Sequence, residues 1–126
     1  MKKPKVKLHM HDNVSPASVG LVLGALTEMS GRQGWFYAGR IGSELKIGVT
    51  QGCPFCRMDQ QYLSYLGIAF SDDCYAHESR MKRALGKPSH GNEYFSNWEC
   101  RFQWLCENRF VRSILEIEVE LARKFG

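Results

Sequence analysis

The chain has 126 residues, of which 44% are hydrophobic and 24% are charged, which suits one compact domain and is short for two. Its net charge of +4 and pI near 8.9 are compatible with a polyanionic partner, but they do not by themselves indicate one. No apolar run approaches the roughly 20 residues that span a bilayer, and the Lys-rich start lacks the apolar core of a signal peptide. We therefore expect a cytoplasmic protein that makes no membrane contact.

Residues 1–33 form a predicted extension of the domain. Apolar and polar residues alternate over 6–10, as they do in an edge strand. Ser15 followed by Pro16 is typical of a helix start, and an apolar stripe then continues to Gly31. Because such a stripe requires burial, we expect this extension to pack on the domain, with a nucleic-acid-contacting arm as the alternative.

A β-hairpin is predicted within residues 34–57, GWFYAGRIGSELKIGVTQGCPFCR. Two runs rich in aromatic and β-branched residues, Trp35–Ala38 and Leu45–Val49, are separated by a link that contains two glycines. The hairpin is followed by a Gly-Cys-Pro turn and then by a predicted helix. This order would bring Tyr37 and Lys46 close to the start of that helix.

The helix after the turn is predicted to run from Arg57 to Leu66, because its apolar residues follow helical spacing and Gly67 ends the pattern. Arg57 would then lie in the first turn. Free N–H groups and the helix dipole favour an anion there, so a guanidinium beside them would suit a phosphate. An ordinary exposed ion pair with Asp59 is the alternative.

Ile68–Phe70 is predicted to be a third short strand, and a helix capped within residues 71–73 should follow and run to Leu85. Glu78 falls on the apolar face of that helix. A carboxylate in such a place is costly to desolvate unless a cation or hydrogen bonds compensate it. Glu78 is therefore a candidate metal ligand, or else it lies at the rim of the stripe and reaches solvent.

After a loop containing glycine and proline, Glu93–Phe95 is predicted to return as a short strand or extended segment. Ser96 and Glu99 have the spacing of a capping box, which predicts a helix from Asn97. From Phe110 onward the apolar pattern fits both a helix and a strand. We favour a helix for this last segment.

Five short elements occur in a defined order along the chain. They are Phe36-Tyr37, Lys46-Ile47-Gly48, Arg57, Glu78 and Gly91-Asn92-Glu93-Tyr94-Phe95. This order resembles the GIY-YIG nuclease superfamily, and within it the phage- and bacterial-type branch in which Lys replaces the second Tyr of the name. The similarity covers residues 34–97.

The resemblance implies an α/β (α+β) fold with a small central antiparallel three-stranded sheet flanked by helices. On this basis, residues 34–97 would be the nuclease-like core. Residues 1–33 would be the packed N-terminal extension, and residues 98–126 a C-terminal helical segment of the same domain. The implied activity is metal-dependent hydrolysis of phosphodiester bonds in DNA, with RNA as the other candidate substrate and a dimer as one option for the assembly.

Site residues follow from the same resemblance. Glu78 would hold Mg²⁺ or Mn²⁺, Arg57 and Lys46 would stabilise the phosphate, and Tyr37 would orient or activate water, roles that suit the chemistry of phosphodiester hydrolysis. Further substrate contacts are expected from Arg40, His90, Asn92 and Glu93.

Two features differ from the family pattern. The position one helical turn after the arginine carries His or Tyr in many members, whereas it is Gln61 here. The Asn usually found near the final strand has only loose counterparts in Asn92 and Asn97. His77 or His90 could serve as a base instead. The alternative function is a nucleic-acid-binding protein with weak or no catalysis or a zinc-stabilised interaction module, and the third is a glutaredoxin-like thiol oxidoreductase acting through Cys53 and Cys56.

The five cysteines are an odd number, which favours reduced thiols or a metal site over a disulfide framework. Cys53, Cys56, Cys74 and His77 have the spacing of a structural zinc site, as in a zinc-stabilised interaction module. Cys53 and Cys56 alone also resemble a glutaredoxin-like motif at a helix N-terminus, although no later segment matches that fold. The remaining option is that these cysteines are small buried residues.

Overall fold

The computed structural model describes residues 20, 22, 30–91 and 93–125. The helices and strands, in chain order, are β1 (Gly34–Ile41), β2 (Glu44–Thr50), α2 (Pro54–Gln60), β3 (Ser64–Ser71), α3 (Cys74–Leu85), β4 (Tyr94–Phe95), α4 (Trp98–Glu107), β5 (Arg112–Ser113) and α5 (Ile114–Phe125). The strand predicted at 6–10 and most of the helix predicted before Gly31 lie outside the described residues. No helix of the described part is long and apolar enough to cross a membrane.

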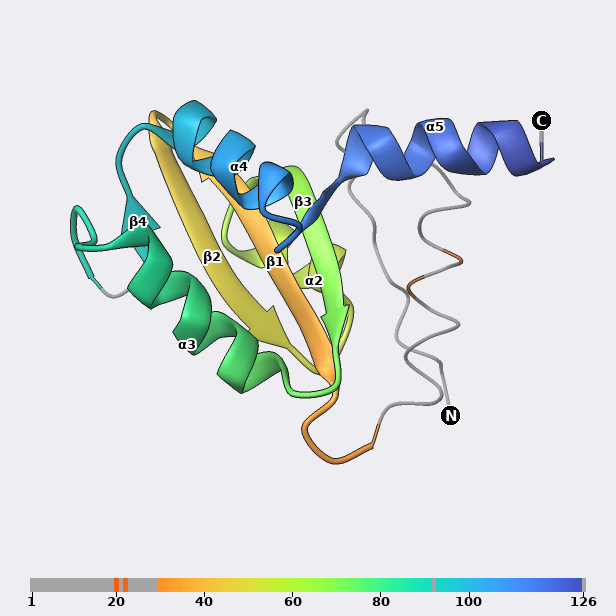
Figure 1. The fold of residues 1–126 in the computed structure, drawn as a ribbon, viewed down its shortest axis with the longest axis horizontal. Coiled ribbons are helices and arrows are strands. Elements are labelled where there is room, and N and C mark those ends of the chain that lie inside the picture. Colours follow the sequence, from red (N-terminus) through yellow and green to blue (C-terminus); the bar gives the residue numbers. More distant parts are fainter. Residues whose placement is uncertain (1–19, 21, 23–29, 92, 126) are drawn as a thin grey trace.

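The fold is mixed α/β, with a five-stranded antiparallel sheet in the order β4-β2-β1-β3-β5 (Figure 1). The three predicted strands form its centre, and the sheet is larger than expected because β4 and β5, each two residues long, pair with its edges. β1 is the central strand and is paired on both sides. Its neighbours therefore fix the direction of every side chain along it.

The predicted hairpin is confirmed. β1 and β2 pair with Ile41 opposite Glu44, which leaves a two-residue turn at Gly42-Ser43. Gly42 has a positive φ of 59°, the conformation that tight hairpin turns require and that glycine adopts without strain.

The helix predicted over 57–66 is wrong in both of its bounds. α2 begins at Pro54 and ends after seven residues, so Arg57 lies in its last turn. The N–H of Arg57 donates to the Cys53 carbonyl oxygen (3.1 Å) and is not free to bind an anion. The proposed anion site at the helix start is therefore not formed as expected.

The end of α2 has a clear physical cause. The Tyr62 N–H donates to Asp59 O (3.0 Å) and the Leu63 N–H to Met58 O (2.9 Å), which is the Schellman pattern of helix termination. It places Tyr62 at a positive φ of 58°. The apolar residues that follow belong to β3, where Tyr65 is buried. Their spacing fits a helix and a strand about equally well, which explains the error.

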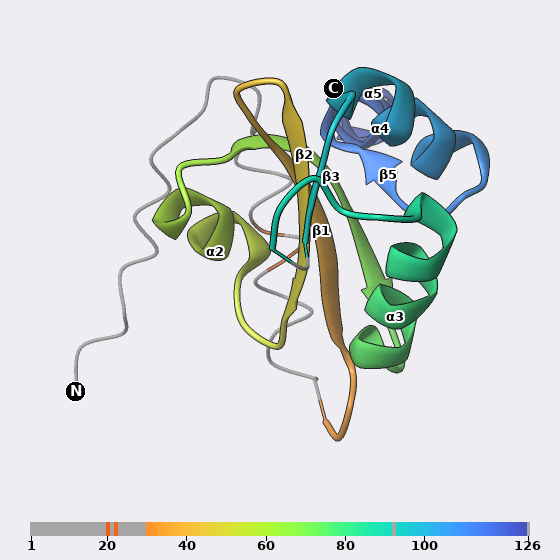
Figure 2. The same cartoon turned by 90° about the vertical axis from the view of Figure 1, so that its left-hand side faces the viewer.

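The sheet separates two hydrophobic clusters, with α2 on one face and α3 and α4 on the other (Figure 2). The cluster on the α2 face contains Val22, Trp35, Tyr37, Phe55, Met58, Leu63, Tyr65, Ile68, Ile114 and Ile117. The cluster on the α3 face contains Phe36, Ala38, Leu45, Ile47, Met81, Leu85, Phe95, Leu105 and Val111. Successive residues of β1 alternate between the two, as the pleat of a strand requires.

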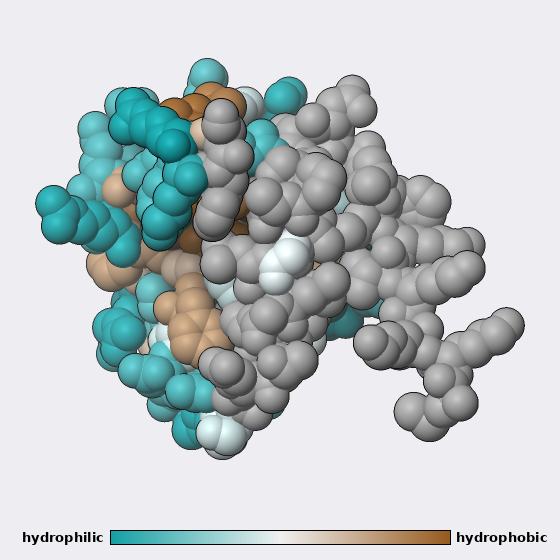
Figure 3. Space-filling model, turned by 90° about the vertical axis from the view of Figure 1, so that its right-hand side faces the viewer, coloured by the Kyte–Doolittle hydropathy of each residue, from teal (hydrophilic) through white to brown (hydrophobic). Residues whose placement is uncertain are grey.

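The last two helices differ in detail from the sequence prediction. Asn97 adopts a left-handed conformation and makes no side-chain cap, so the predicted capping box of Ser96 and Glu99 is not formed. The helix favoured after Phe110 is confirmed as α5, preceded by the short strand β5. Its residues Leu115 and Val119 are exposed. Figure 3 views this end of the molecule and shows apolar and hydrophilic side chains side by side.

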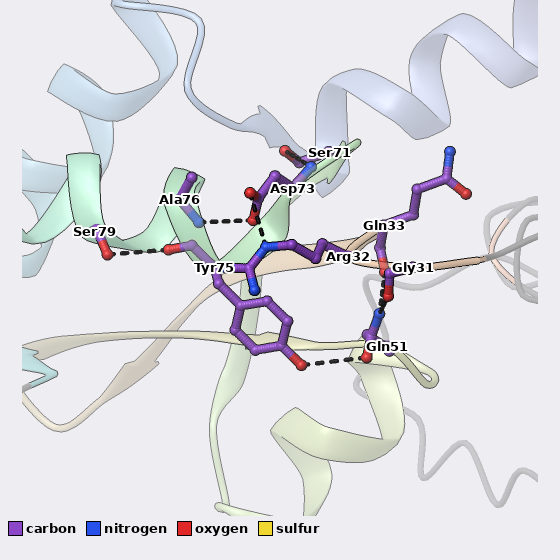
Figure 4. Close-up of polar contacts among 9 residues, drawn as sticks. All are labelled: Gly31, Arg32, Gln33, Gln51, Ser71, Asp73, Tyr75, Ala76 and Ser79. Carbon is purple, nitrogen blue, oxygen red and sulfur yellow. Dashed lines mark hydrogen bonds and ion pairs between the residues drawn. The ribbon is translucent and has the colours of Figure 1, made fainter.

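A polar network joins three segments where β1 begins and where β2 and β3 end (Figure 4). The Arg32 guanidinium donates to Asp73 Oδ2 (2.9 Å), and Asp73 Oδ1 caps α3 by accepting from Ala76 N (3.0 Å). Gln51 accepts from the Tyr75 hydroxyl (3.2 Å) and donates to the Gly31 carbonyl (2.6 Å). The network fixes the start of α3 against the sheet.

Candidate active site

Tyr37 lies near the middle of the central strand, and its side chain is buried on the α2 face. Its register partner on β2 is Gly48. A Cβ at that glycine would lie 2.3 Å from the Tyr37 hydroxyl oxygen, closer than two atoms can pack. The glycine of Lys46-Ile47-Gly48 therefore provides the space in which the phenol lies.

Lys46 is a buried cation beside that phenol. Only 5% of the residue is exposed, and its Nζ lies 2.9 Å from Glu93 Oε1 and 3.5 Å from the Tyr37 hydroxyl. The Nζ is also 5.5 Å from the Tyr37 ring centre and 5.9 Å from that of Tyr94. A carboxylate and two aromatic faces thus compensate the desolvation of the ammonium.

Glu78 and Lys82 reach the same place from α3. Lys82 Nζ lies 3.8 Å from Glu78 Oε1 and 3.9 Å from Glu93 Oε2. The Glu78 side chain is only 15% exposed. Two carboxyl groups and two ammonium groups therefore lie together with the Tyr37 phenol, and we call these five residues (Tyr37, Lys46, Glu78, Lys82 and Glu93) the carboxylate–lysine cluster.

The pKa values of the two carboxyl groups of the cluster are shifted in opposite directions. Burial raises the pKa of Glu78, the charge of Lys82 opposes this, and the hydrogen bond with Glu93 raises it further. Burial also acts to raise the pKa of Glu93, but the hydrogen bond and charge of Lys46 outweigh it, so that this pKa is lowered. Lys46 therefore favours the charged form of Glu93, whereas burial disfavours the charged form of Glu78.

One atom of this pair is well suited to a metal ion. Glu78 Oε2 is buried and receives no hydrogen bond from a donor in the described part of the chain. A buried oxygen without a donor is costly, and a divalent cation would compensate it. Mg²⁺ is commonly held by one or two carboxylates together with substrate phosphate oxygens and water, so Glu78 and Glu93 are a suitable pair.

The cluster forms at the edge of the sheet. Tyr37 packs on the α2 face, whereas Glu78 comes from α3 on the opposite face. They are linked through Lys46 and Glu93 at the place where β2 pairs with β4. The sequence predicts that Tyr37 and Glu78 meet in one pocket; in the structure they come from opposite faces of the sheet, and the contacts between them run through Lys46, Glu93 and Lys82.

Gln61 connects α2 to the cluster. Its side-chain N–H donates to the Tyr37 hydroxyl oxygen at 3.0 Å. Arg57 is exposed and lies four residues earlier, in the last turn of α2. An amide cannot take up a proton near neutral pH, so Gln61 orients the phenol and does not act as a base.

The structure places the four predicted substrate contacts as follows. Glu93 belongs to the carboxylate–lysine cluster, and Asn92 lies outside the described residues. The Arg40 guanidinium is 4.6 Å from the Trp98 ring centre and donates to the Gly42 carbonyl. His90 stacks on the Tyr94 ring at 4.5 Å.

Two supporting residues were not predicted from the sequence. Glu44 accepts from His90 Nε2 (2.7 Å) and from the Ser89 hydroxyl, which fixes the loop that leads to Glu93. Lys82 bridges the two carboxyls of the cluster. Its i,i+4 spacing from Glu78 was a readable signal, whereas the role of Glu44 depends on tertiary contacts.

The four predicted zinc ligands are not brought together. No group of three or more His, Cys, Asp or Glu side chains suited to a metal occurs among the described residues, which include all four. Cys53 and Cys56 lie together at the start of α2, whereas His77 Nε2 contacts the Phe110 carbonyl oxygen (3.0 Å). Burial lowers the pKa of this histidine, and its ring packs against Phe36, away from the cluster.

The thiol pair also differs from an activated redox motif. Burial and the neighbouring Cys53 raise the pKa of the Cys56 thiol to about 12. Nucleophilic thiols in Cys-x-x-Cys motifs have a lowered pKa. The pair therefore packs as small, partly buried side chains at the start of α2. Cys53 packs against the hydrophobic cluster on the α2 face of the sheet.

Comparison of the chain with models of known protein families, with curated proteins and with solved structures gave no match. The geometry of the site is therefore the basis for the proposal that follows.

Proposed function

We propose that this protein is a metal-dependent nuclease that hydrolyses phosphodiester bonds in DNA. The observation that carries the proposal is the carboxylate–lysine cluster. It combines a partly buried carboxyl pair suited to a divalent cation with two ammonium groups and a phenol. The order of these residues along the chain also resembles the GIY-YIG superfamily.

Each side chain has a distinct part in this proposal. Glu78 and Glu93 would hold Mg²⁺ or Mn²⁺, which supplies Lewis-acid polarisation of a phosphoryl oxygen. Lys46 and Lys82 offset negative charge that develops on the phosphate. Tyr37, with Lys46 and Gln61 directed at its oxygen, orients the attacking water by a hydrogen bond.

Arg57 would contact the phosphate on the solvent side. Its exposed position one turn before Gln61 leaves the guanidinium able to reach a bound strand, and a guanidinium can make two parallel hydrogen bonds to a phosphate. The contact would come from the side of α2, since the helix start does not provide a free N–H group at this residue.

Cleavage of supercoiled plasmid DNA in Mg²⁺ or Mn²⁺ tests the proposal. We expect nicking by the wild-type protein, loss of at least about 100-fold in rate for Glu78→Gln because a metal-holding carboxylate is removed, and no loss for Glu118→Gln on α5. A chelator should abolish the reaction. Equal activity of Glu78→Gln and wild type would refute the assigned role.

A nucleic-acid-binding protein without catalysis is the second candidate, and Gln61 favours it because the family base is absent from that position. The same preparation distinguishes the two functions. Retarded migration of DNA without any nicking in either metal would support binding alone. Nicking that depends on Glu78 would support the nuclease.

A further inference from the structure

Tyr62 is the most exposed of the large hydrophobic residues in the described part of the chain, with 86% of its surface accessible. It is also one of the few residues other than glycine with a positive φ, at 58°. The Schellman position that it occupies is usually glycine, because a side chain there strains the backbone. Burial in the core therefore does not explain why a tyrosine stands at this position.

The backbone around Tyr62 is held rigidly. Its N–H donates to Asp59 O (3.0 Å), and the neighbouring Leu63 is fully buried and donates its N–H to Met58 O (2.9 Å). The residue before it, Gln61, contacts the Tyr37 hydroxyl at 3.0 Å. Tyr62 is therefore an exposed aromatic ring on a hydrogen-bonded turn, one residue after the glutamine that contacts the phenol of the candidate active site.

We propose that Tyr62 stacks on an unpaired base, so that the substrate presents single-stranded or locally unpaired nucleotides to the site. This inference rests on the proposed function and specifies its substrate class. An exposed aromatic ring next to cationic groups is the usual device for binding single strands, since every base has a face that can stack. Arg57, in the last turn of the short helix α2 that ends two residues before Tyr62, would contact the adjoining phosphate.

Strain at this position supports the same reading. Arg109 has a similar φ of 61° after α4, so the conformation alone does not indicate function. At Tyr62 the strain coincides with near-complete exposure and with the contact from Gln61 to the site. A Tyr62→Gly variant should therefore raise the urea midpoint of unfolding while it weakens single-strand binding, a combination that a purely structural residue would not give.

The test is equilibrium binding to two probes in the presence of a chelator, so that no cleavage occurs. One probe is a single-stranded oligonucleotide that contains 2-aminopurine, whose fluorescence falls when the base stacks on an aromatic ring. The other is the same strand in a fully paired duplex. We expect Tyr62→Ala to weaken single-strand binding by about 10-fold and Tyr62→Phe to retain it within about twofold.

Matched controls separate stacking from general damage. Leu115→Ala, which removes another exposed hydrophobic side chain, on α5, should leave both affinities unchanged, and duplex binding should change little in Tyr62→Ala. Wild-type single-strand affinity in Tyr62→Ala would overturn the proposal, as would equal losses on both probes or no binding to either probe. If the protein gives any of these three binding results but still nicks plasmid DNA, the nuclease proposal stands and only the stacking role of Tyr62 is refuted.

Discussion

At the scale of single residues, the two carboxyls of the candidate site differ in what surrounds them. The hydrogen bond and charge of Lys46 lower the pKa of Glu93, whereas Glu78 is less exposed and its burial raises its pKa. A proton and the proposed metal ion would compete for the Glu78 carboxyl. We therefore expect the affinity for Mg²⁺ to fall as the pH is lowered.

The raised pKa of Glu78 gives a prediction for stability. A carboxyl with a raised pKa in the folded state binds its proton more tightly there than in the unfolded chain. Its stabilising effect is complete below the unfolded pKa and is lost as the pH rises through the folded pKa. Without metal, Glu78→Gln should therefore have a larger free energy of unfolding than wild type at pH 8, and the difference should shrink toward pH 4.

Urea unfolding at both pH values, with a chelator present, measures this effect. Glu118→Gln serves as the control, since it removes a carboxyl outside the cluster and should show no such pH-dependent gain. Saturating Mg²⁺ at pH 8 should stabilise the wild type and not Glu78→Gln. A gain for Glu78→Gln that is the same at pH 4 and pH 8 would contradict the assigned cause.

At the scale of elements, the hairpin and α3 could be predicted because local rules determine them, whereas α5 was favoured over a strand from a pattern that fits both. Gly42 marks the turn, Asp73 caps α3, and the apolar residues of β1 face two cores. The end of α2 could not be predicted in this way. Its termination depends on a left-handed Tyr62, and the apolar residues that follow fit a helix as well as a strand.

The candidate site could be predicted only in part for a related reason. Order along the chain identified Tyr37, Lys46, Glu78 and Glu93, all of which the structure brings into one cluster. The expected first-turn position of Arg57 was wrong because it depended on the helix bounds. Glu44 acts through a loop that is distant in sequence, which no local pattern reveals.

Gly48 tests how closely β2 packs against the Tyr37 phenol of β1. Gly48→Ala would place a Cβ within 2.3 Å of the buried Tyr37 hydroxyl oxygen, so we expect a loss of about 1–3 kcal/mol in the free energy of unfolding from overpacking. Gly52→Ala is the control, since its nearest atom would be at an ordinary 3.5 Å. Urea unfolding of both variants measures the difference, and equal stabilities would show that the phenol moves aside at little cost.

At the scale of the whole molecule, both hydrophobic clusters pack against the same sheet, one on each face. The segment after residue 98 supplies Leu105 to the cluster on the α3 face and Ile117 to the cluster on the α2 face. Neither cluster is complete without this segment. We therefore expect the predicted core and C-terminal segment to unfold together as a single cooperative unit.

Leu105→Ala and Ile117→Ala test this expectation, one on each face. Each should lower the free energy of unfolding by about 2–5 kcal/mol because it leaves a cavity in a closely packed core. Each should also keep a single transition with the same midpoint by far-UV circular dichroism and tryptophan fluorescence. Two separate transitions in either variant would show that the faces unfold independently.

The carboxylate–lysine cluster takes its side chains from both faces of the sheet and from positions 37 to 93 of the chain. A fragment that lacks either β1 or α3 would lack the phenol or the Glu78 carboxyl. The proposed DNA cleavage should consequently disappear at the same urea concentration at which the fluorescence of the protein reports unfolding. Cleavage that survives beyond that concentration would come from a contaminating enzyme in the preparation, which gives each purified batch an internal check of authenticity.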